Sequence, residues 1–144
     1  MAKCFMDEAK VHEISQWLLK ANHDLESAKR LLAGDPPYRD TAVFHCQQAA
    51  EKALKAHLTL CDSPFSKVHD LRVLVKQAAG FDARFQQFVE AAEVLTPYAT
   101  AFRYPGDVSE PTPADAAEAV LLAGAVLDYV IGQMPAEART NLSR

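Results

Sequence analysis

The chain has 144 residues, of which 49% are hydrophobic and only five are glycine. This length fits one domain with a sizeable core, and sparse glycine favours helices because glycine destabilises a helix interior. The formal net charge of −4 argues against a general nucleic-acid binder that holds phosphates through a broad basic face, although one local basic pocket remains compatible with it.

The first two predicted helices carry repeating apolar side chains at spacings of three and four. A helix is predicted from about Asp7 to Ala33, with Gly34 ending it. A second is predicted from about Asp40 to Cys61, with Asp40 or Thr41 as its N-cap. Their apolar faces comprise Ile14, Trp17, Leu18, Ala21, Leu25, Ala28 and Leu32 in the first helix, and Val43, Ala50, Leu54, Leu58 and Cys61 in the second.

The middle of the chain predicts one short and one longer helix. The short helix begins near His69 or Asp70 and ends at Gly80, with Leu71, Val73 and Leu74 directed inward. The longer one spans about 82–102, and Pro97 within it predicts a kink or a break. The expected inner face of the longer helix comprises Phe85, Phe88, Val89, Ala92 and Leu95.

The last predicted helix has the clearest start. Thr112 is a favoured N-cap, Pro113 suits the first helical position, and Asp115 is placed to complete a capping box. The helix is expected to run to about Gln133 and is apolar nearly all round, so it is either central in the core or half covered by a partner subunit. The tail after Pro135 is expected to be mobile.

The predicted elements together define the fold class. No segment alternates apolar and polar residues with the period of a strand. We therefore predict an all-α protein, an antiparallel up-and-down bundle of four to five helices joined by short loops. It would form a single domain over residues 1–144, with a core of about 10–133 and a flexible tail at 134–144.

Cysteines and apolar stretches bear on the cellular setting. The chain has three cysteines, Cys4, Cys46 and Cys61. Their odd number and the lack of C-x-x-C spacing indicate neither a disulfide framework nor a zinc site, so a reduced cytoplasm is the expected location. The charged N-terminus does not resemble a signal peptide, and the apolar stretch at 116–131 is too short and too interrupted by charges to span a membrane.

One polar stripe stands out on the second predicted helix. Gln48, Glu51, Lys52 and Lys55 fall at i, i+3, i+4 and i+7 along one edge of the apolar face. Glu51 precedes Lys55 by four residues, the favourable order for a helical ion pair. A solvated surface with a salt bridge explains this spacing, and so does the wall of a binding groove.

Three further polar residues lie at helix edges or ends. His69 can cap a helix, bond to a neighbouring segment or titrate in a cleft. Arg103 can interact with the dipole of a helix end or hold a phosphate with its planar guanidinium. Asp24, at the margin of the first apolar face, is a candidate acidic partner for Arg103 or Lys52. The five histidines form no metal-binding pattern, and no glycine-rich phosphate loop or activated nucleophile is visible, so no cofactor or metal is expected and no catalytic residue is assigned.

Four motifs in order resemble a known family. They are the segments 21–25 (Ala-Asn-His-Asp-Leu), 47–56 (Gln-Gln-Ala-Ala-Glu-Lys-Ala-Leu-Lys-Ala), 69–71 (His-Asp-Leu) and 103–105 (Arg-Tyr-Pro). This arrangement resembles the HEPN domain over about residues 10–131. The resemblance implies a helical bundle, like the substrate-binding subunits of nucleotidyltransferases, that usually dimerises and often pairs with a minimal nucleotidyltransferase in toxin–antitoxin-like systems.

The same resemblance sets an expectation about catalysis. Some HEPN proteins are metal-independent RNases that carry an arginine followed after four to six residues by a histidine. No histidine follows Arg103 in this chain, and the pair Arg39 and His45, which has that spacing, lies at the start of the second predicted helix rather than near the later helices. The departure favours a non-catalytic subgroup.

The sequence leaves three hypotheses about function. In the first, a nucleotide- or RNA-binding module uses a groove lined by Asp24, Gln48, Glu51, Lys52, Lys55, His69, Arg103 and Tyr104, where Tyr104 stacks on a base. In the second, His69 and Arg103 meet across a dimer and cleave RNA without metal. In the third, Asp24, Glu51, Lys52 and Arg103 form an internal ion-pair network in a dimeric scaffold whose interface includes Val126.

Overall fold

The computed structural model describes residues 6–65, 67–106, 109–139 and 142, and within these ranges it contains only helices and loops. The α-helices are α1 (Glu8–Ala33), α2 (Arg39–Leu60), α3 (Leu71–Ala79), α4 (Val89–Leu95) and α5 (Pro113–Gly132). Three short 3-10 helices accompany them: η1 (Ala83–Phe88), η2 (Thr96–Ala99) and η3 (Ala136–Arg139). The predicted all-α bundle is confirmed.

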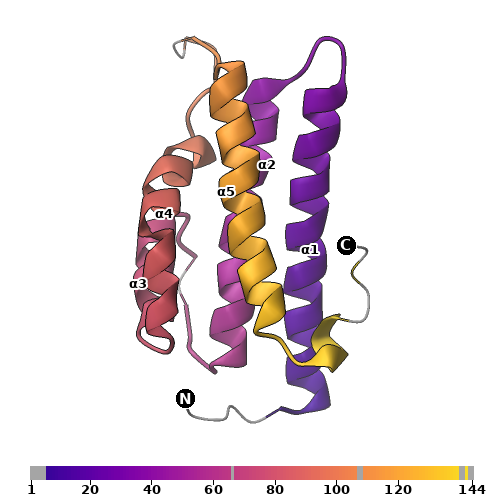
Figure 1. The fold of residues 1–144 in the computed structure, drawn as a ribbon, viewed down its shortest axis with the longest axis vertical. Coiled ribbons are helices and arrows are strands. Elements are labelled where there is room, and N and C mark those ends of the chain that lie inside the picture. The colour runs from indigo at the N-terminus through magenta and orange to yellow at the C-terminus, as the bar shows by residue number, and fades with distance from the viewer. Residues whose placement is uncertain (1–5, 66, 107–108, 140–141, 143–144) are drawn as a thin grey trace.

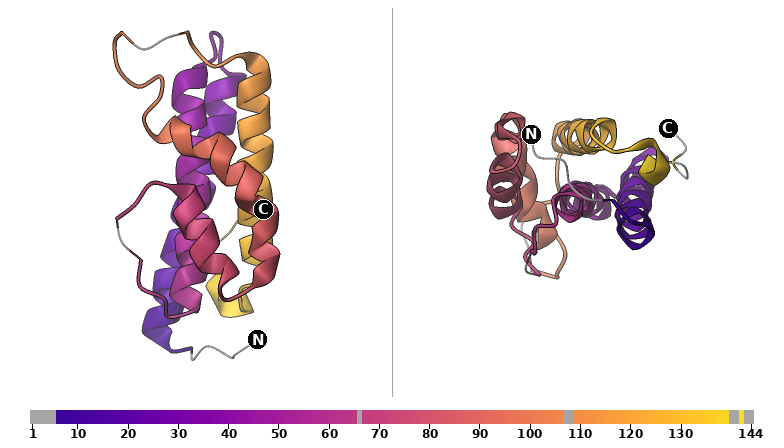
Figure 2. Two further views of the ribbon diagram at one scale, coloured as in Figure 1. Left: turned by 90° about the vertical axis from the view of Figure 1, so that its left-hand side faces the viewer. Right: turned by 90° about the horizontal axis from the view of Figure 1, so that it is seen from below.

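The long helices α1, α2 and α5 form the body of the bundle (Figure 1). Helix α2 packs against both α1 and α5, and α3 and α4 lie along one side of it (Figure 2). Many of the α2 residues that face the core are alanines, which allow neighbouring helices to approach closely. These buried alanines are Ala42, Ala49, Ala50, Ala53 and Ala56.

The helix starts follow from local sequence. The Asp7 side chain accepts a hydrogen bond from the Lys10 backbone amide at 2.7 Å and begins α1. Thr112 and Asp115 form the predicted reciprocal capping box at the start of α5. The predicted start of α2 is wrong in detail, because its N-cap is Tyr38 without a side-chain hydrogen bond, and Asp40 and Thr41 lie inside the first turn.

The segment predicted as one helix over 82–102 is broken. It begins as η1, continues as the short α4 and ends as η2, which contains Pro97. Two side chains predicted to point inward are instead exposed, Val73 on α3 by 49% and Val89 on α4 by 47%. The change from a 3-10 helix to an α-helix alters the rotation between successive residues, and this accounts for the face that Val89 presents. Val73 lies on α3, outside the broken segment.

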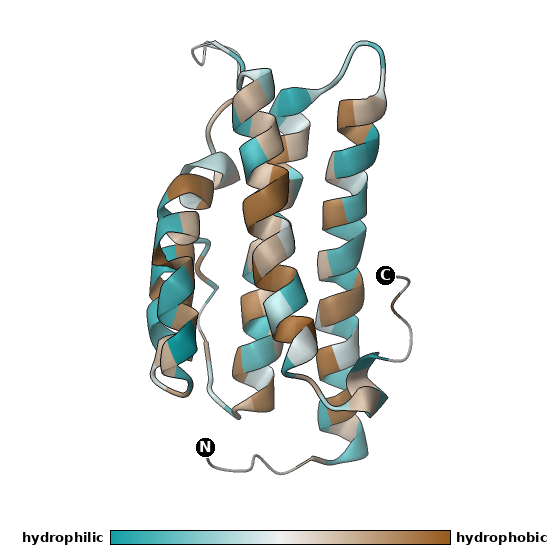
Figure 3. Ribbon diagram, in the orientation of Figure 1, coloured by the Kyte–Doolittle hydropathy of each residue, from teal (hydrophilic) through white to brown (hydrophobic). Residues whose placement is uncertain are grey.

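The last helix has the predicted bounds, because α5 has Thr112 as its N-cap and Gln133 as its C-cap. Val126, considered as an interface residue, is buried in the core at 2% exposure. The segment expected to be a mobile tail contains η3, which packs against α1 with Ala138 buried; residues 140, 141, 143 and 144 lie outside the described residues. Apolar residues recur along α5 (Figure 3), yet none of the described helices combines the length and apolarity that a membrane span requires.

Candidate functional site

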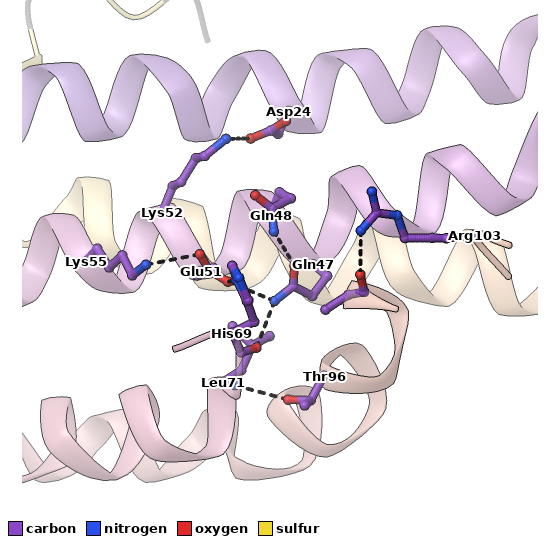
Figure 4. Close-up of polar contacts among 11 residues, drawn as sticks. Asp24, Gln47, Gln48, Glu51, Lys52, Lys55, His69, Leu71, Thr96 and Arg103 are labelled. Carbon is purple, nitrogen blue, oxygen red and sulfur yellow. Dashed lines mark hydrogen bonds and ion pairs between the residues drawn. The ribbon is translucent and has the colours of Figure 1, made fainter. Parts of the chain in front are cut away.

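The polar residues of α2 form two separate stripes rather than one. Gln47, Glu51 and Lys55 recur every four residues and face the loop between α2 and α3. His45, Gln48 and Lys52 lie on the neighbouring face, and Lys52 points toward α1 (Figure 4). The predicted single groove is therefore divided between two clusters.

The first cluster is centred on Glu51, which is buried at 4% exposure. Glu51 Oε2 accepts a hydrogen bond from Lys55 Nζ at 3.1 Å, and Glu51 Oε1 lies 2.9 Å from His69 Nδ1. The amide of Gln47 donates both to Glu51 Oε1 and to the backbone carbonyl of His69. This cluster ties the loop before α3 to the middle of α2.

Lys55 is enclosed on its other side by aromatic rings. Its Nζ lies 5.7 Å from the centroid of the Trp17 ring and 5.6 Å from that of Phe65. A buried lysine is stable only with such compensation from an opposite charge and polarisable neighbours. The arrangement gives Lys55 and Glu51 a structural role and leaves little of either side chain accessible to a ligand.

The second cluster is centred on Asp24 of α1, which is also buried. Asp24 Oδ2 accepts a hydrogen bond from Lys52 Nζ at 2.5 Å, and Asp24 Oδ1 lies 2.8 Å from His45 Nδ1. Lys52 was one of the two cations expected to pair with Asp24. Arg103, the other, does not pair with it, so the four-residue ion-pair network expected for a scaffold is not formed.

Arg103 lies at the end of the segment that follows η2. Phe102 adopts a left-handed backbone conformation with φ of 67°, which redirects the chain just before the arginine. The guanidinium carbon lies 4.2 Å from the centroid of the Phe44 ring and 5.8 Å from that of Tyr104. Nη1 donates to the backbone carbonyl of Ala99 at 3.1 Å, and within the described ranges no carboxylate forms an ion pair with Arg103.

A small pocket of about 290 Å³ lies beside Arg103, lined by Asp40, Thr41, Phe44, His45, Phe102 and Arg103. His45 connects this pocket to the Asp24 cluster, because its Nδ1 faces Asp24 while the side chain is 28% exposed. His45 Nε2 has no hydrogen-bond partner among the residues that the structure describes. The pocket thus joins a guanidinium, an imidazole and an aromatic ring.

The eight residues predicted for a ligand site are distributed over these features. Arg103 lines the pocket, and Tyr104 is exposed next to it. Asp24 and Lys52 do not line the pocket, but Asp24 contacts the pocket residue His45 and Lys52 contacts Asp24. Glu51, Lys55 and His69 belong to the other cluster, and Gln48 donates to Gln47 between the two. His45 and Phe44 were missed, although His45 lies three residues before Gln48 on the same helical face.

The described part of the chain contains no group of three histidine, cysteine or carboxylate side chains placed to hold a metal ion. The side chains that line the pocket supply hydrogen-bond donors and acceptors. A guanidinium supplies paired N–H donors for an anion, and a neutral imidazole supplies one donor and one acceptor.

Comparisons of the sequence and of the structure with known proteins both point to the HEPN domain. The sequence model of the HEPN domain matches residues 14–134. The solved structure of TT1696 from Thermus thermophilus is 32% identical, with 84% of this chain and 98% of that chain covered and a TM-score of 0.66. The structure of ST0689, an archaeal HEPN homologue, is 28% identical, with 83% and 96% covered and a TM-score of 0.65. No curated protein matches the chain.

Proposed function

The chain belongs to the HEPN domain family, and from that premise we propose that it is a non-catalytic module that binds a phosphate-bearing ligand, a nucleotide or RNA, in the pocket beside Arg103. The observation that carries the proposal is the setting of Arg103. Its guanidinium is exposed, rests on the Phe44 ring and uses one N–H on a backbone carbonyl. Its remaining N–H groups suit bidentate contact with phosphate oxygens.

The neighbours of Arg103 supply the rest of the proposed site. Tyr104 is 64% exposed beside the guanidinium and offers a ring on which a base can stack. His45 lines the pocket, with Asp24 and Lys52 behind it. Glu51, Lys55 and His69 would act indirectly in this proposal, because they hold the loop before α3 rather than the ligand.

Replacing Arg103 by alanine tests this function. We expect Arg103→Ala to weaken binding of adenosine monophosphate or of a short oligoribonucleotide at least tenfold in calorimetric titration, since a charge-assisted hydrogen bond contributes about 1.5–3 kcal/mol. Arg30→Ala, at an exposed position on α1, is the matched control. Unchanged affinity in a folded Arg103→Ala variant would refute the proposed site.

A metal-independent RNase is the second candidate, favoured by one specific observation. His45 and Arg103 line the same pocket, and the Asp24 carboxylate orients His45 as an acid–base group is oriented in many active sites. His69 lies within hydrogen-bond distance of Glu51 and does not line this pocket.

RNA cleavage in excess chelator separates the two candidates. If the protein is an RNase, His45→Ala and Arg103→Ala should each reduce the cleavage rate by at least a hundredfold, as expected for loss of a general base or of charge stabilisation, while His69→Ala should retain most of it. If the folded wild-type protein cleaves nothing, the RNase candidate fails and the binding function is unaffected.

We also propose two protein partners, a minimal nucleotidyltransferase in a toxin–antitoxin-like pair and a second copy of this chain. The support for the first is family membership. The support for the second is Leu121 of α5, a large apolar side chain that is 74% exposed. A co-purification of the chain with nucleotidyltransferases expressed alongside it tests the first partnership.

A further inference from the structure

Lys52, Asp24 and His45 form a chain of hydrogen bonds that ends at the pocket. Lys52 on α2 donates to one oxygen of Asp24 at 2.5 Å, and the other oxygen lies 2.8 Å from His45 Nδ1. Asp24 is buried, whereas His45 reaches the pocket surface. The hydrogen bonds among Lys52, Asp24 and His45 therefore connect the interface between α1 and α2 to the wall of the pocket.

The chemistry of these groups fixes where the His45 proton lies. An ammonium group can only donate hydrogen bonds, so the Asp24 oxygen facing Lys52 must accept. An ionised carboxylate also accepts at its second oxygen, so His45 Nδ1 must carry a proton. In the neutral imidazole Nε2 is then an acceptor, and it is the nitrogen with no partner among the described residues.

Within this pocket, which the Asp40 carboxylate and the Thr41 hydroxyl also line, Arg103 and His45 present two different kinds of group to a ligand. Arg103 offers only donors, which suit phosphate oxygens, while His45 Nε2 offers an acceptor, which repels a phosphate oxygen and requires a donor. A phosphate ester that also carries a hydroxyl close to the phosphate satisfies both, because the hydroxyl supplies the donor. Ribonucleotides carry such a hydroxyl at the 2′ position, and deoxyribonucleotides do not.

We propose that Lys52 and Asp24 are positioning residues that set the tautomer of His45, and that the pocket selects phosphate esters with a free hydroxyl beside the phosphate over analogues that lack it. This inference rests on the proposed function, because it requires the pocket to bind a phosphate ester. Beyond that function, the selectivity comes from one acceptor atom, His45 Nε2. Asp24 and Lys52 determine that this nitrogen carries no proton.

Matched ligands test the selectivity. The probes are adenosine 3′-monophosphate, its 2′-deoxy analogue and its 2′-O-methyl analogue, which has an oxygen but no donor. In mildly alkaline buffer we expect the first to bind wild-type protein about tenfold more tightly than the other two, since one hydrogen bond of about 1.4 kcal/mol corresponds to that factor.

Two variants test the positioning role. His45→Ala should reduce the tenfold ratio to about one. In Asp24→Asn the amide oxygen must face Lys52, so the amide N–H₂ faces His45 Nδ1 and moves the imidazole proton to Nε2. We expect this variant to lose the ratio and to exchange the ¹⁵N NMR shifts of the two His45 nitrogens between pyrrole-type and pyridine-type values. His23→Ala and Asp35→Asn, at exposed positions, are the matched controls.

The outcomes separate the inference from the function on which it rests. Binding of all three ligands with equal affinity would overturn the inference and leave the phosphate site intact. A ribonucleotide preference that survives His45→Ala, or unchanged imidazole shifts in Asp24→Asn, would also overturn it. If none of the three ligands binds, the proposed function itself fails.

Discussion

His57 of α2 is a titratable side chain enclosed by the core, with 1% of its surface exposed. Its Nδ1 has no hydrogen-bond partner among the described residues, and its ring packs on Phe85 with centroids 4.2 Å apart. Burial lowers the pKa of His57 to about 4, although the nearby Asp82 carboxylate opposes the shift. The imidazole is therefore held neutral in the folded protein.

This burial predicts a loss of stability in mild acid. The unfolded state binds a proton at His57 below its ordinary pKa of about 6.5, whereas the folded state resists it down to about pH 4, so the free energy of unfolding falls as pH drops through that window. The loss is of order 3 kcal/mol, from about 1.4 kcal/mol per pKa unit. Thermal unfolding of His57→Gln should show a smaller dependence on pH between 7 and 4 than the wild type.

The exposed His12 supplies the control, since His12→Gln should leave the pH dependence unchanged. Asp82 also makes the free energy of unfolding depend on pH, but over a lower pH range than His57. The hydrogen bond from the Arg84 side chain is the main cause that lowers the pKa of Asp82 to about 2, so its stabilisation is lost only at still lower pH. A wild-type stability that stays flat between pH 7 and 4 would contradict the account of His57.

The sequence predicted Asp24 as a partner of Lys52 or Arg103, and of these two cations the structure shows the pair with Lys52 alone. Successive helical residues differ by about 100°, so Glu51 and Lys52 face different neighbours although both lie near the apolar face. Which neighbour each meets depends on the packing of α1 and of the loop before α3. His45 was missed for the same reason, because only the position of Asp24 reveals its role.

The start of α5 contributes measurable stability through its capping box. Thr112→Ala removes the acceptor for the Asp115 amide and should lower the free energy of unfolding by about 1 kcal/mol. Urea denaturation should show a lower midpoint with an unchanged slope. Thr41→Ala is the matched control: α2 has no side-chain cap, so this change should have little effect. Equal losses in the two variants would contradict the capping argument.

Helix boundaries were predictable where a local hydrogen bond sets them and not where tertiary packing does. Asp7 and Thr112 each accept such a hydrogen bond at a helix start that the sequence located. The segment 82–102 was predicted as one kinked helix, because Pro97 was visible but the 3-10 turn of η1 was not. Phe85 and Phe88 are both buried there and contact Tyr129 of α5, a packing requirement that no local pattern contains.

The molecule as a whole exposes apolar surface on α5, which bears on self-association. If this face joins two copies, Leu121→Arg should convert a dimer to a monomer in analytical ultracentrifugation without lowering the thermal midpoint, since Leu121 is largely exposed. Val73→Arg, at another exposed apolar position, is the control. Val126→Arg is unsuitable, because it places a charge in the core and would unfold the chain. A dimer that survives Leu121→Arg would exclude this face.

The global architecture was the most predictable feature, because helical periodicity and the absence of strand patterns are properties of the whole sequence. The face of α5 that is buried could not be predicted, because a helix that is apolar nearly all round does not indicate which side faces the core. The structure resolves this ambiguity by burying Ala123, Leu127 and Val130 while Leu121 stays exposed.

The setting of Lys55 also gives the protein an internal optical reporter. Trp17 is the only tryptophan in the chain, and it contacts both the Lys55 ammonium and, at 5.9 Å between ring centroids, Phe65 of the loop before α3. Indole emission responds to a nearby charge and to solvent. Any event that separates this loop from α2 would therefore change the tryptophan fluorescence of the unlabelled protein. The packing of the loop against α2 can thus be followed in real time.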